Sequence, residues 1–380
     1  MLAAGLLCAP GAQAQVVVHS NENLASDRPE AWAMRYVAAS TRMTAFGQTP
    51  SIAPWNWGAA LDLGYIPKLS EDQQRVGLHG TKPEDLNRSP VFGRLRVLLG
   101  LPGEFVATLG YTPPIYIDGV RVNDLVAVAI ARRLVETENF TLSMQLFGQH
   151  GRAQGDITCP RGLAGVDDPQ RNPYGCQAPS NDHTYLNYYG AELTASWNVD
   201  AWHAHASIGD VRTEFAVQVD ALTFSVRDRS YLTSNGPMPY ATLGVGYDLD
   251  THWNVGVEVL YGFDGGSDGS AGDTHHYGDV WGAAGYVGYK VNDMLTVNGR
   301  LEKEHYNLNF GGPGVSGNLY EATLGVTITP LPKDPYLKGF AVRPEIRYDF
   351  TDSSDSPFQA NGDRTYRDQL TFGCDVIFRF

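Results

Sequence analysis

The last eleven residues, LTFGCDVIFRF at 370–380, decide the fold of this chain. Counting back in steps of two from Phe380 gives a run of apolar side chains that includes Phe378, Val376 and Phe372. The positions between them are mostly polar. Successive side chains of a β-strand point to opposite faces, so the stretch predicts a strand with one apolar face. That face must meet either a protein core or lipid.

The composition excludes two classes of protein. The 380 residues carry a formal net charge of −14, which argues against a nucleic-acid partner, because such partners need clustered Lys and Arg. The longest apolar run, at 125–130, is far shorter than the ~18 residues that a transmembrane helix needs. Helical membrane spans are therefore excluded. Transmembrane barrels are not, because their signal in each strand is much weaker.

We expect residues 1–14 to be a cleaved export signal. A short apolar stretch precedes the sequence AQA at 12–14, which has the small-x-small pattern of a cleavage site. Acylation at Cys8 is the weaker alternative, because Leu7 is bulky for that kind of cleavage. An export signal also implies a compartment in which disulfides form.

Alternating apolar and polar residues recur from about residue 55 to the end of the chain. Many of these segments begin or end on Trp, Tyr or Phe, a layout typical of the two aromatic girdles of an outer-membrane barrel. The connections are short at 248–252 and 290–294, and long and polar at several other places. The alternating segments lie at 57–65, 91–100, 140–149, 189–197, 253–263, 281–289, 295–302, 320–328 and 340–350.

This pattern predicts an all-β fold, a transmembrane antiparallel up-and-down β-barrel. One hairpin with its turn and loop uses roughly 40–50 residues, so we expect about 14 strands, with a range of about 12–16. A soluble β-sandwich is the alternative, but a closed barrel better explains a chain that ends on an apolar strand without a polar tail. The expected divisions are a signal at 1–14, a partly ordered N-terminal segment at 15–54, and one barrel domain at 55–380.

Three segments carry a resemblance to a known family. YEATLGVTITPLP at 320–332, VRPEIRYDF at 342–350 and DQLTFGCDVIFRF at 368–380 resemble the closing hairpins of the β-barrel porins of Gram-negative outer membranes. The resemblance covers about the last hundred residues and implies a location in the bacterial outer membrane. It also implies a terminal signal for the barrel assembly machinery, made of Phe380, Phe378, Val376 and Phe372.

Charged residues fall on the polar side of several predicted strands. Two interpretations are open: they line a hydrated pore, or they form structural pairs across neighbouring strands. Pro344 has no N–H to donate, so we expect a local bulge at this position. The candidate pore-lining residues are Glu258, Arg300, Glu302, Arg343, Glu345, Arg347 and Asp349, with His203 and His205 from the sequence WHAHAS.

The two histidines admit a second reading. His203 and His205 share a strand face with Ser207, and Asp210 follows, so a metal site or a barrel hydrolase is conceivable. Neighbouring positions on one face are ~6–7 Å apart, which is long for a nucleophile and its base. A solvated pair of histidines in the lumen is the preferred interpretation.

Cys159 and Cys176 are expected to form a disulfide inside a long polar loop. Closing a loop of this size contributes roughly 3 kcal/mol in the chain-entropy model. A zinc site is the alternative, but no further ligand lies at zinc spacing. Cys374 falls on the apolar face of the last strand and should be inert.

The sequence therefore favours a porin-like channel for passive diffusion of small hydrophilic solutes. The alternatives are a barrel enzyme and a structural or adhesin barrel with a plugged lumen. We expect no cofactor and no metal, although the acidic loop at 264–273 leaves calcium open. The expected partners are outer-membrane lipid, the barrel assembly machinery and small hydrophilic solutes. A homo-oligomer is left open, because no segment marks a subunit contact.

Overall fold

The structure is a computed structural model, and the predicted signal at 1–14 lies outside its described residues. In the described part of the chain, no helix is both long and apolar enough to cross a bilayer. The described residues are 16–24, 28–39, 41, 52–65, 69, 73–85, 88–224, 226–264, 277–309, 315–334, 337–353, 358 and 366–379.

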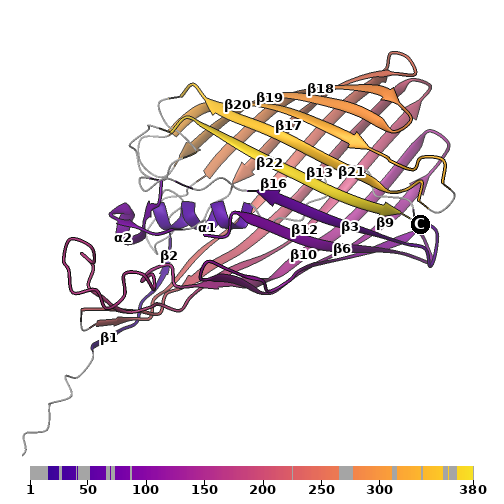
Figure 1. The fold of residues 1–380 in the computed structure, drawn as a ribbon. Helices are drawn as coiled ribbons and strands as arrows, with labels where there is room; N and C mark the ends of the chain where they lie inside the picture. The colour runs from indigo at the N-terminus through magenta and orange to yellow at the C-terminus, as the bar shows by residue number, and fades with distance from the viewer. Residues whose placement is uncertain are drawn as a thin grey trace, which may run out of the picture.

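Fourteen antiparallel strands of the described chain form one closed sheet, as predicted (Figure 1). The strands follow chain order around the wall, and closure comes from the pairing of β22 with β3. Over the height that all fourteen strands share, closure leaves no row of unpaired backbone groups, which is the condition for a sheet to span lipid. The strands are β3 (Trp57–Tyr65), β6 (Val91–Leu101), β7 (Phe105–Thr112), β9 (Val120–Glu136), β10 (Phe140–Gly155), β12 (Asp182–Val199), β13 (Trp202–Gln218), β16 (Tyr231–Asp248), β17 (Trp253–Asp264), β18 (Tyr277–Asn292), β19 (Leu295–Asn309), β20 (Val315–Ile328), β21 (Ala341–Thr351) and β22 (Asp368–Arg379).

The two ends of the barrel differ. Short connections such as 137–139, 200–201 and 293–294 gather at the end where β22 finishes and the C-terminus lies (Figure 1). Long connections such as 66–90 and 156–181 gather at the opposite end. Outer-membrane barrels have short periplasmic turns and long extracellular loops, so we assign the long-loop end to the cell exterior.

The long-loop end carries the N-terminal segment and several small elements (Figure 1). Strand β1 pairs in parallel with β15 in a separate four-stranded sheet, and β2 pairs in parallel with the start of β16. The elements are α1 (Pro29–Ala39), α2 (Gly77–Gly80), β1 (Val16–Val18), β2 (Asn21–Asn23), β4 (Arg75–Val76), β5 (Lys82–Pro83), β8 (Tyr116–Ile117), β11 (Cys176–Ala178), β14 (Ala221–Thr223) and β15 (Val226–Asp228).

The barrel wall is taller on one side. Strand β16 pairs with β17 from Tyr240 onward, so the first part of β16 extends beyond its neighbour. Strand β2 covers the start of this edge, and Pro237 and Pro239 remove two N–H donors from it. Prolines and short covering strands are common devices that prevent unwanted pairing at a sheet edge.

The outer face of the barrel is apolar, with aromatic residues near both ends. Leu301 and Val257 are 69% and 63% exposed, which fits side chains that face lipid rather than a protein core. At the short-turn end, Trp202 packs against Tyr247, with ring centroids 4.6 Å apart. At the long-loop end, Tyr320 stacks on Phe350 at 5.0 Å. These pairs correspond to the two predicted girdles.

The predicted bulge at Pro344 is wrong. The β20–β21 ladder is interrupted between the pair Gly325–Glu345 and the pair Ile328–Val342. Both strands have the same number of residues between these pairs, so the register is unchanged. The missing N–H of Pro344 leaves a gap in the ladder without inserting an extra residue.

Candidate pore and its N-terminal plug

The inner wall carries a ladder of charged side chains across neighbouring strands. Glu302 of β19, Glu321 of β20 and Asp349 of β21 stand side by side in register. Arg300 contacts Glu302, and its Nε lies 3.1 Å from Glu321 Oε2. Because each acid lies near a guanidinium, much of the charge of this ladder is neutralised along the wall.

The ladder continues toward the short-turn end. Arg343 donates from Nε to Asp375 Oδ1 at 2.8 Å, and Arg347 donates from Nη2 to Asp349 Oδ1 at 2.7 Å. The side chains of Arg343 and Arg347 remain 50% and 38% exposed. Glu345 lies on the same face and is exposed. The ladder thus combines pairing across strands with contact to solvent.

Sequence alternation identified most of this wall but missed some of its members. The seven acidic and basic candidates all lie at inward positions of β17, β19 and β21. Glu321 and Asp375, the partners of Arg300 and Arg343, also face inward and were missed. The inward pair of Asp62 and Arg96 was missed as well. These four occupy polar positions of alternating strands, so the same count would have found them.

The two histidines bind carboxylates rather than each other. His203 lies 2.9 Å from both Asp248 Oδ2 and Asn198 Oδ1. His205 Nε2 lies 3.0 Å from Glu258 Oε2. Both rings face inward and are partly exposed, as expected for lumen histidines.

The hydrolase grouping is not assembled. Ser207 is buried, and its hydroxyl lies 2.9 Å from the hydroxyl of Thr194. Asp210 lies on the outer face of β13, where its Oδ2 accepts from Arg212 Nε at 3.3 Å. Residues an odd number of positions apart on a strand point to opposite faces, so Asp210 cannot join Ser207.

The N-terminal helix lies on the inner side of the wall at the long-loop end. Its residues Ala31 and Met34 are 0% and 1% exposed. They form one apolar cluster with Leu125, Leu186 and Phe215, which are inward-facing residues of β9, β12 and β13. Helix α1 therefore occupies part of the lumen at this mouth. We call residues 28–41 the N-terminal plug.

The plug continues deeper into the barrel. Arg94 of β6 donates to the Thr41 carbonyl and, at 2.6 Å, to Gln149 Oε1 of β10. Both side chains are buried, as is Thr41. Further along the chain, Trp55 donates from its backbone N–H to Gly100 O at 2.7 Å, near the short-turn end. Thr41 and Trp55 thus lie toward opposite ends of the barrel.

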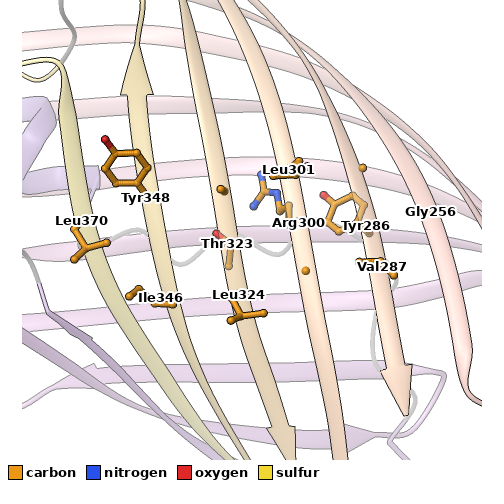
Figure 2. Close-up of a pocket in the computed structure, with 13 residues that line it drawn as sticks. Gly256, Tyr286, Val287, Arg300, Leu301, Thr323, Leu324, Ile346, Tyr348 and Leu370 are labelled. Carbon is orange, nitrogen blue, oxygen red and sulfur yellow. The ribbon is translucent and has the colours of Figure 1, made fainter. Parts of the chain in front are cut away.

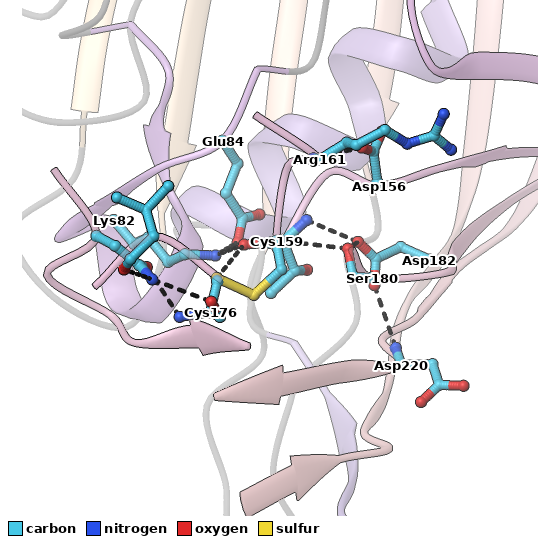
Figure 3. The surroundings of a disulfide bond; sticks show 12 residues. Lys82, Glu84, Asp156, Cys159, Arg161, Cys176, Ser180, Asp182 and Asp220 are labelled. Atoms are coloured by element: carbon cyan, nitrogen blue, oxygen red, sulfur yellow. Dashed lines mark hydrogen bonds and ion pairs between the residues drawn. A yellow bond between two sulfur atoms is a disulfide. The ribbon is translucent and has the colours of Figure 1, made fainter. Parts of the chain in front are cut away.

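The predicted disulfide joins Cys159 and Cys176, and both residues are buried (Figure 3). Ser180 Oγ accepts from the Cys159 N–H at 2.9 Å, and Asn172 Oδ1 accepts from the Cys176 N–H at 2.8 Å. Cys374 is a free thiol on the last strand, as expected. The bridge lies within the loop 156–181, which is at the long-loop end of the barrel.

Three other predicted sites have different outcomes. Phe378, Val376 and Phe372 lie on the outer face of β22, whereas Phe380 lies outside the described residues. Most of the acidic loop at 264–273 also lies outside them. Within the described ranges, no group of three or more His, Cys, Asp or Glu side chains is placed to hold a metal ion.

A shallow depression of about 500 Å³ lies over β17–β22 (Figure 2). Leu301, Leu324 and Leu370 line it, and they belong to the lipid-facing set. Gly285 and Gly299 occupy outward positions there, so the wall is thin at this place. Most of its lining is lipid-facing, and Arg300 and Thr323 of the inner wall also border it.

The family comparison covers the strands that carry the charged ladder. Residues 198–380 match the family described as "Putative beta-barrel porin-2, OmpL-like". This part of the chain is therefore similar to porins of that family. The match spans β13 to β22, which is more of the chain than the terminal hairpins that suggested a porin. The protein lies in the bacterial outer membrane.

Other comparisons are more distant. No curated protein sequence matches the chain. A Pseudomonas aeruginosa FadL homologue aligns at a TM-score of 0.45 with 12% identity, over 93% of this chain and 94% of that one. The β domain of the Bordetella autotransporter BrkA aligns at 0.43 with 10% identity, over 87% and 100%. The Pseudomonas putida toluene transporter TodX aligns at 0.41 with 12% identity, over 96% and 98%.

Proposed function

We propose that this protein is a porin-like passive channel for small hydrophilic solutes. Its N-terminal plug closes the channel at rest. The observation that carries the proposal is the inward ladder of paired but solvent-accessible charges. It includes the ion pairs of Arg343 with Asp375 and of Arg347 with Asp349. Such a wall replaces part of a solute's hydration with fixed polar groups. Transport then needs no chemical step.

The plug suits a reversible gate because its apolar contact is small. Met34 is the largest fully buried side chain on the inner side of α1, and burial of one such side chain contributes about 1.5–3 kcal/mol. Arg94 and Gln149 add hydrogen bonds to Thr41. A free-energy difference of a few kcal/mol between the closed and open states leaves a minor open population. A solute or a transmembrane potential can increase that population.

Single-channel recording in planar bilayers tests this function. The variant Met34→Asp places a charge in the apolar contact, and deletion of residues 16–41 removes the plug. Both should give frequent open steps where the full chain is mostly closed. The control Val17→Asp adds the same charge on exposed β1, outside the lumen, and should behave like the full chain.

Two results would contradict the proposal. Absence of steps from the chain without its plug would show a structural barrel with a filled lumen. Equal, steady conductance in the full chain and in the deleted chain would show that the plug does not close the pore. Folding of each variant is checked first by the heat-dependent gel migration of the barrel.

We also infer that the barrel assembly machinery recognises the last strand. Phe372, Val376 and Phe378 present an apolar row on the outer face of β22, next to β3. Until the barrel closes, the backbone edge of β22 that pairs with β3 is free as well. Substitution of Phe378 by Ser should lower the amount of porin that reaches the outer membrane, while refolding of the purified chain in detergent should be unaffected.

A further inference from the structure

A cavity of about 370 Å³ lies at the long-loop mouth, between the plug, the segment 73–85 and the extended part of the wall. None of the ladder residues lines this mouth cavity. We propose that it is a binding site for a small amphipathic molecule that carries no negative charge. The site goes beyond channel function, because nothing in the conduction of hydrophilic solutes requires an apolar cavity at the mouth.

Apolar side chains from separate parts of the chain form most of the cavity wall. Met34 comes from α1, Val76 from β4, and Ile157 from the base of the disulfide loop. Val217 and Leu232 come from the adjoining ends of β13 and β16. Cavities of 300–1,000 Å³ with apolar walls and a few polar groups are the common form of small-molecule sites. The body of the ligand is therefore expected to be apolar.

Both cations at the cavity are already engaged. Lys82 donates to the Thr158 carbonyl and lies 3.2 Å from Glu84 Oε1. Arg28 lies 2.9 Å from Glu22 and 3.1 Å from Glu30. An anionic ligand would have to displace one of these carboxylates. Such a ligand also would meet an excess of acidic residues, because Asp182 and Asp228 line the same cavity.

Glu84 supplies the most suitable polar group for a ligand. Burial raises the pKa of its carboxyl, and the neighbouring Asp182 acts in the same direction, whereas Lys82 opposes the shift. One oxygen of the Glu84 carboxyl accepts a hydrogen bond from the Lys82 ammonium. A ligand hydroxyl can therefore donate to the other oxygen. Gly77 allows this arrangement, because a Cβ there would overlap the Glu84 side chain.

The disulfide loop holds the polar end of the cavity in place (Figure 3). The ring of Tyr174 lies 5.7 Å from Lys82 Nζ, and the Thr158 carbonyl beside Cys159 accepts from the same ammonium. Tyr174 also donates from its hydroxyl to Thr81 O at 2.9 Å. The bridge from Cys159 to Cys176 therefore positions the groups that hold Lys82 beside Glu84.

Binding of 4-ethylphenol to the purified full chain in lipid nanodiscs tests the site. Saturation-transfer NMR measures the ligand signal, with empty nanodiscs subtracted to remove partition into lipid. Two variants fill the cavity from different walls, Ala33→Phe from α1 and Ala153→Phe from β10. The matched control Ala283→Phe adds the same ring on the lipid face of β18. The expectation that the ligand carries no negative charge is tested with 4-ethylbenzoate, an anion of similar size.

We expect saturable binding of 4-ethylphenol to the natural chain and to the control, and at least about tenfold weaker binding to a folded filled variant. Binding of 4-ethylbenzoate should be weaker by at least about tenfold as well. Equal phenol binding by the natural and filled chains would overturn the site, and tight benzoate binding would overturn the expectation that the ligand carries no negative charge. Neither measurement depends on conductance, so the channel proposal and this site can fail separately.

Discussion

His205 of β13 binds Glu258 of β17 at 3.0 Å by reaching across Gly244 of the strand between them. The three residues stand in one row of the inner wall. A Cβ on Gly244 would overlap the imidazole ring. This glycine thus allows two strands that are not neighbours to share a polar contact on the lumen side.

Substitution of Gly244 by Ala should therefore remove the His205–Glu258 contact. Hydrogen bonds to charged groups contribute about 1.5–3 kcal/mol, so we expect a loss of that order in the free energy of unfolding in urea. The control is Gly246→Ala on the same face of β16, where the nearest atom to an added Cβ is 3.5 Å away. Equal losses for both variants would refute a specific role for Gly244.

Removal of Arg300 should change the ion preference of the pore. Arg300→Ala leaves Glu302 and the 2%-exposed Glu321 without their guanidinium partner. We expect a cost of about 1–3 kcal/mol in stability and a reversal potential that moves toward cation preference in a salt gradient. The recordings use the chain that lacks residues 16–41.

The control for Arg300 is Lys303→Ala. Lys303 lies on the outer face of the same strand, so its loss removes one positive charge without altering the lumen. It should leave the reversal potential unchanged. A shift of equal size in both variants would mean that the ladder does not set the selectivity.

The lipid face can be tested with one buried charge. Leu301 lies near the middle of β19 and is 69% exposed in the protein alone. Arg on a lipid-facing position near the bilayer midplane costs about 2–4 kcal/mol, so Leu301→Arg should lose about that much on refolding into vesicles. The control Asn298→Arg points into the lumen of the same strand, and a loss as large as that of Leu301→Arg would contradict the assigned faces.

Loss of the disulfide should expose its loop to protease. Arg161 and Arg171 lie in the loop and are exposed, so trypsin can cut there once the backbone opens. The bridge contributes roughly 3 kcal/mol by the chain-entropy model, and the Cys159→Ser, Cys176→Ser double variant should be cut several-fold faster. If both the rate of cleavage and the binding of 4-ethylphenol were unchanged, the disulfide would have no structural role at the mouth.

Local periodicity made the wall predictable. The face on which Arg300 or Phe372 lies follows from the alternation of side chains along a strand, and this alternation can be read from the neighbouring residues. The same alternation already separates Asp210 from Ser207, so the hydrolase grouping could have been rejected from sequence. The bulge at Pro344 could not have been rejected from sequence. The missing N–H of a proline is compatible either with a gap in the ladder or with an inserted residue.

The plug and the mouth cavity could not be predicted in the same way. The segment that forms α1 has the residues of an ordinary short helix, and its partners Leu186 and Phe215 are more than a hundred residues away. Sequence spacing gives no measure of such a contact. The ion pairs of Lys82 and Arg28 are local in sequence, but the meeting of both pairs at one cavity depends on how the loops fold together.

By itself, the sequence determined that strands with one apolar face make up most of this protein, and it determined which side chains share that face. These properties depend on residues two apart, and a strand geometry follows from them wherever the chain lies. The tertiary structure decided the register of the wall, the reach of His205 across Gly244, and the position of α1 inside the barrel. These depend on contacts between residues far apart in sequence, as in the closure of the sheet by β3 and β22, and such contacts form only in the folded protein.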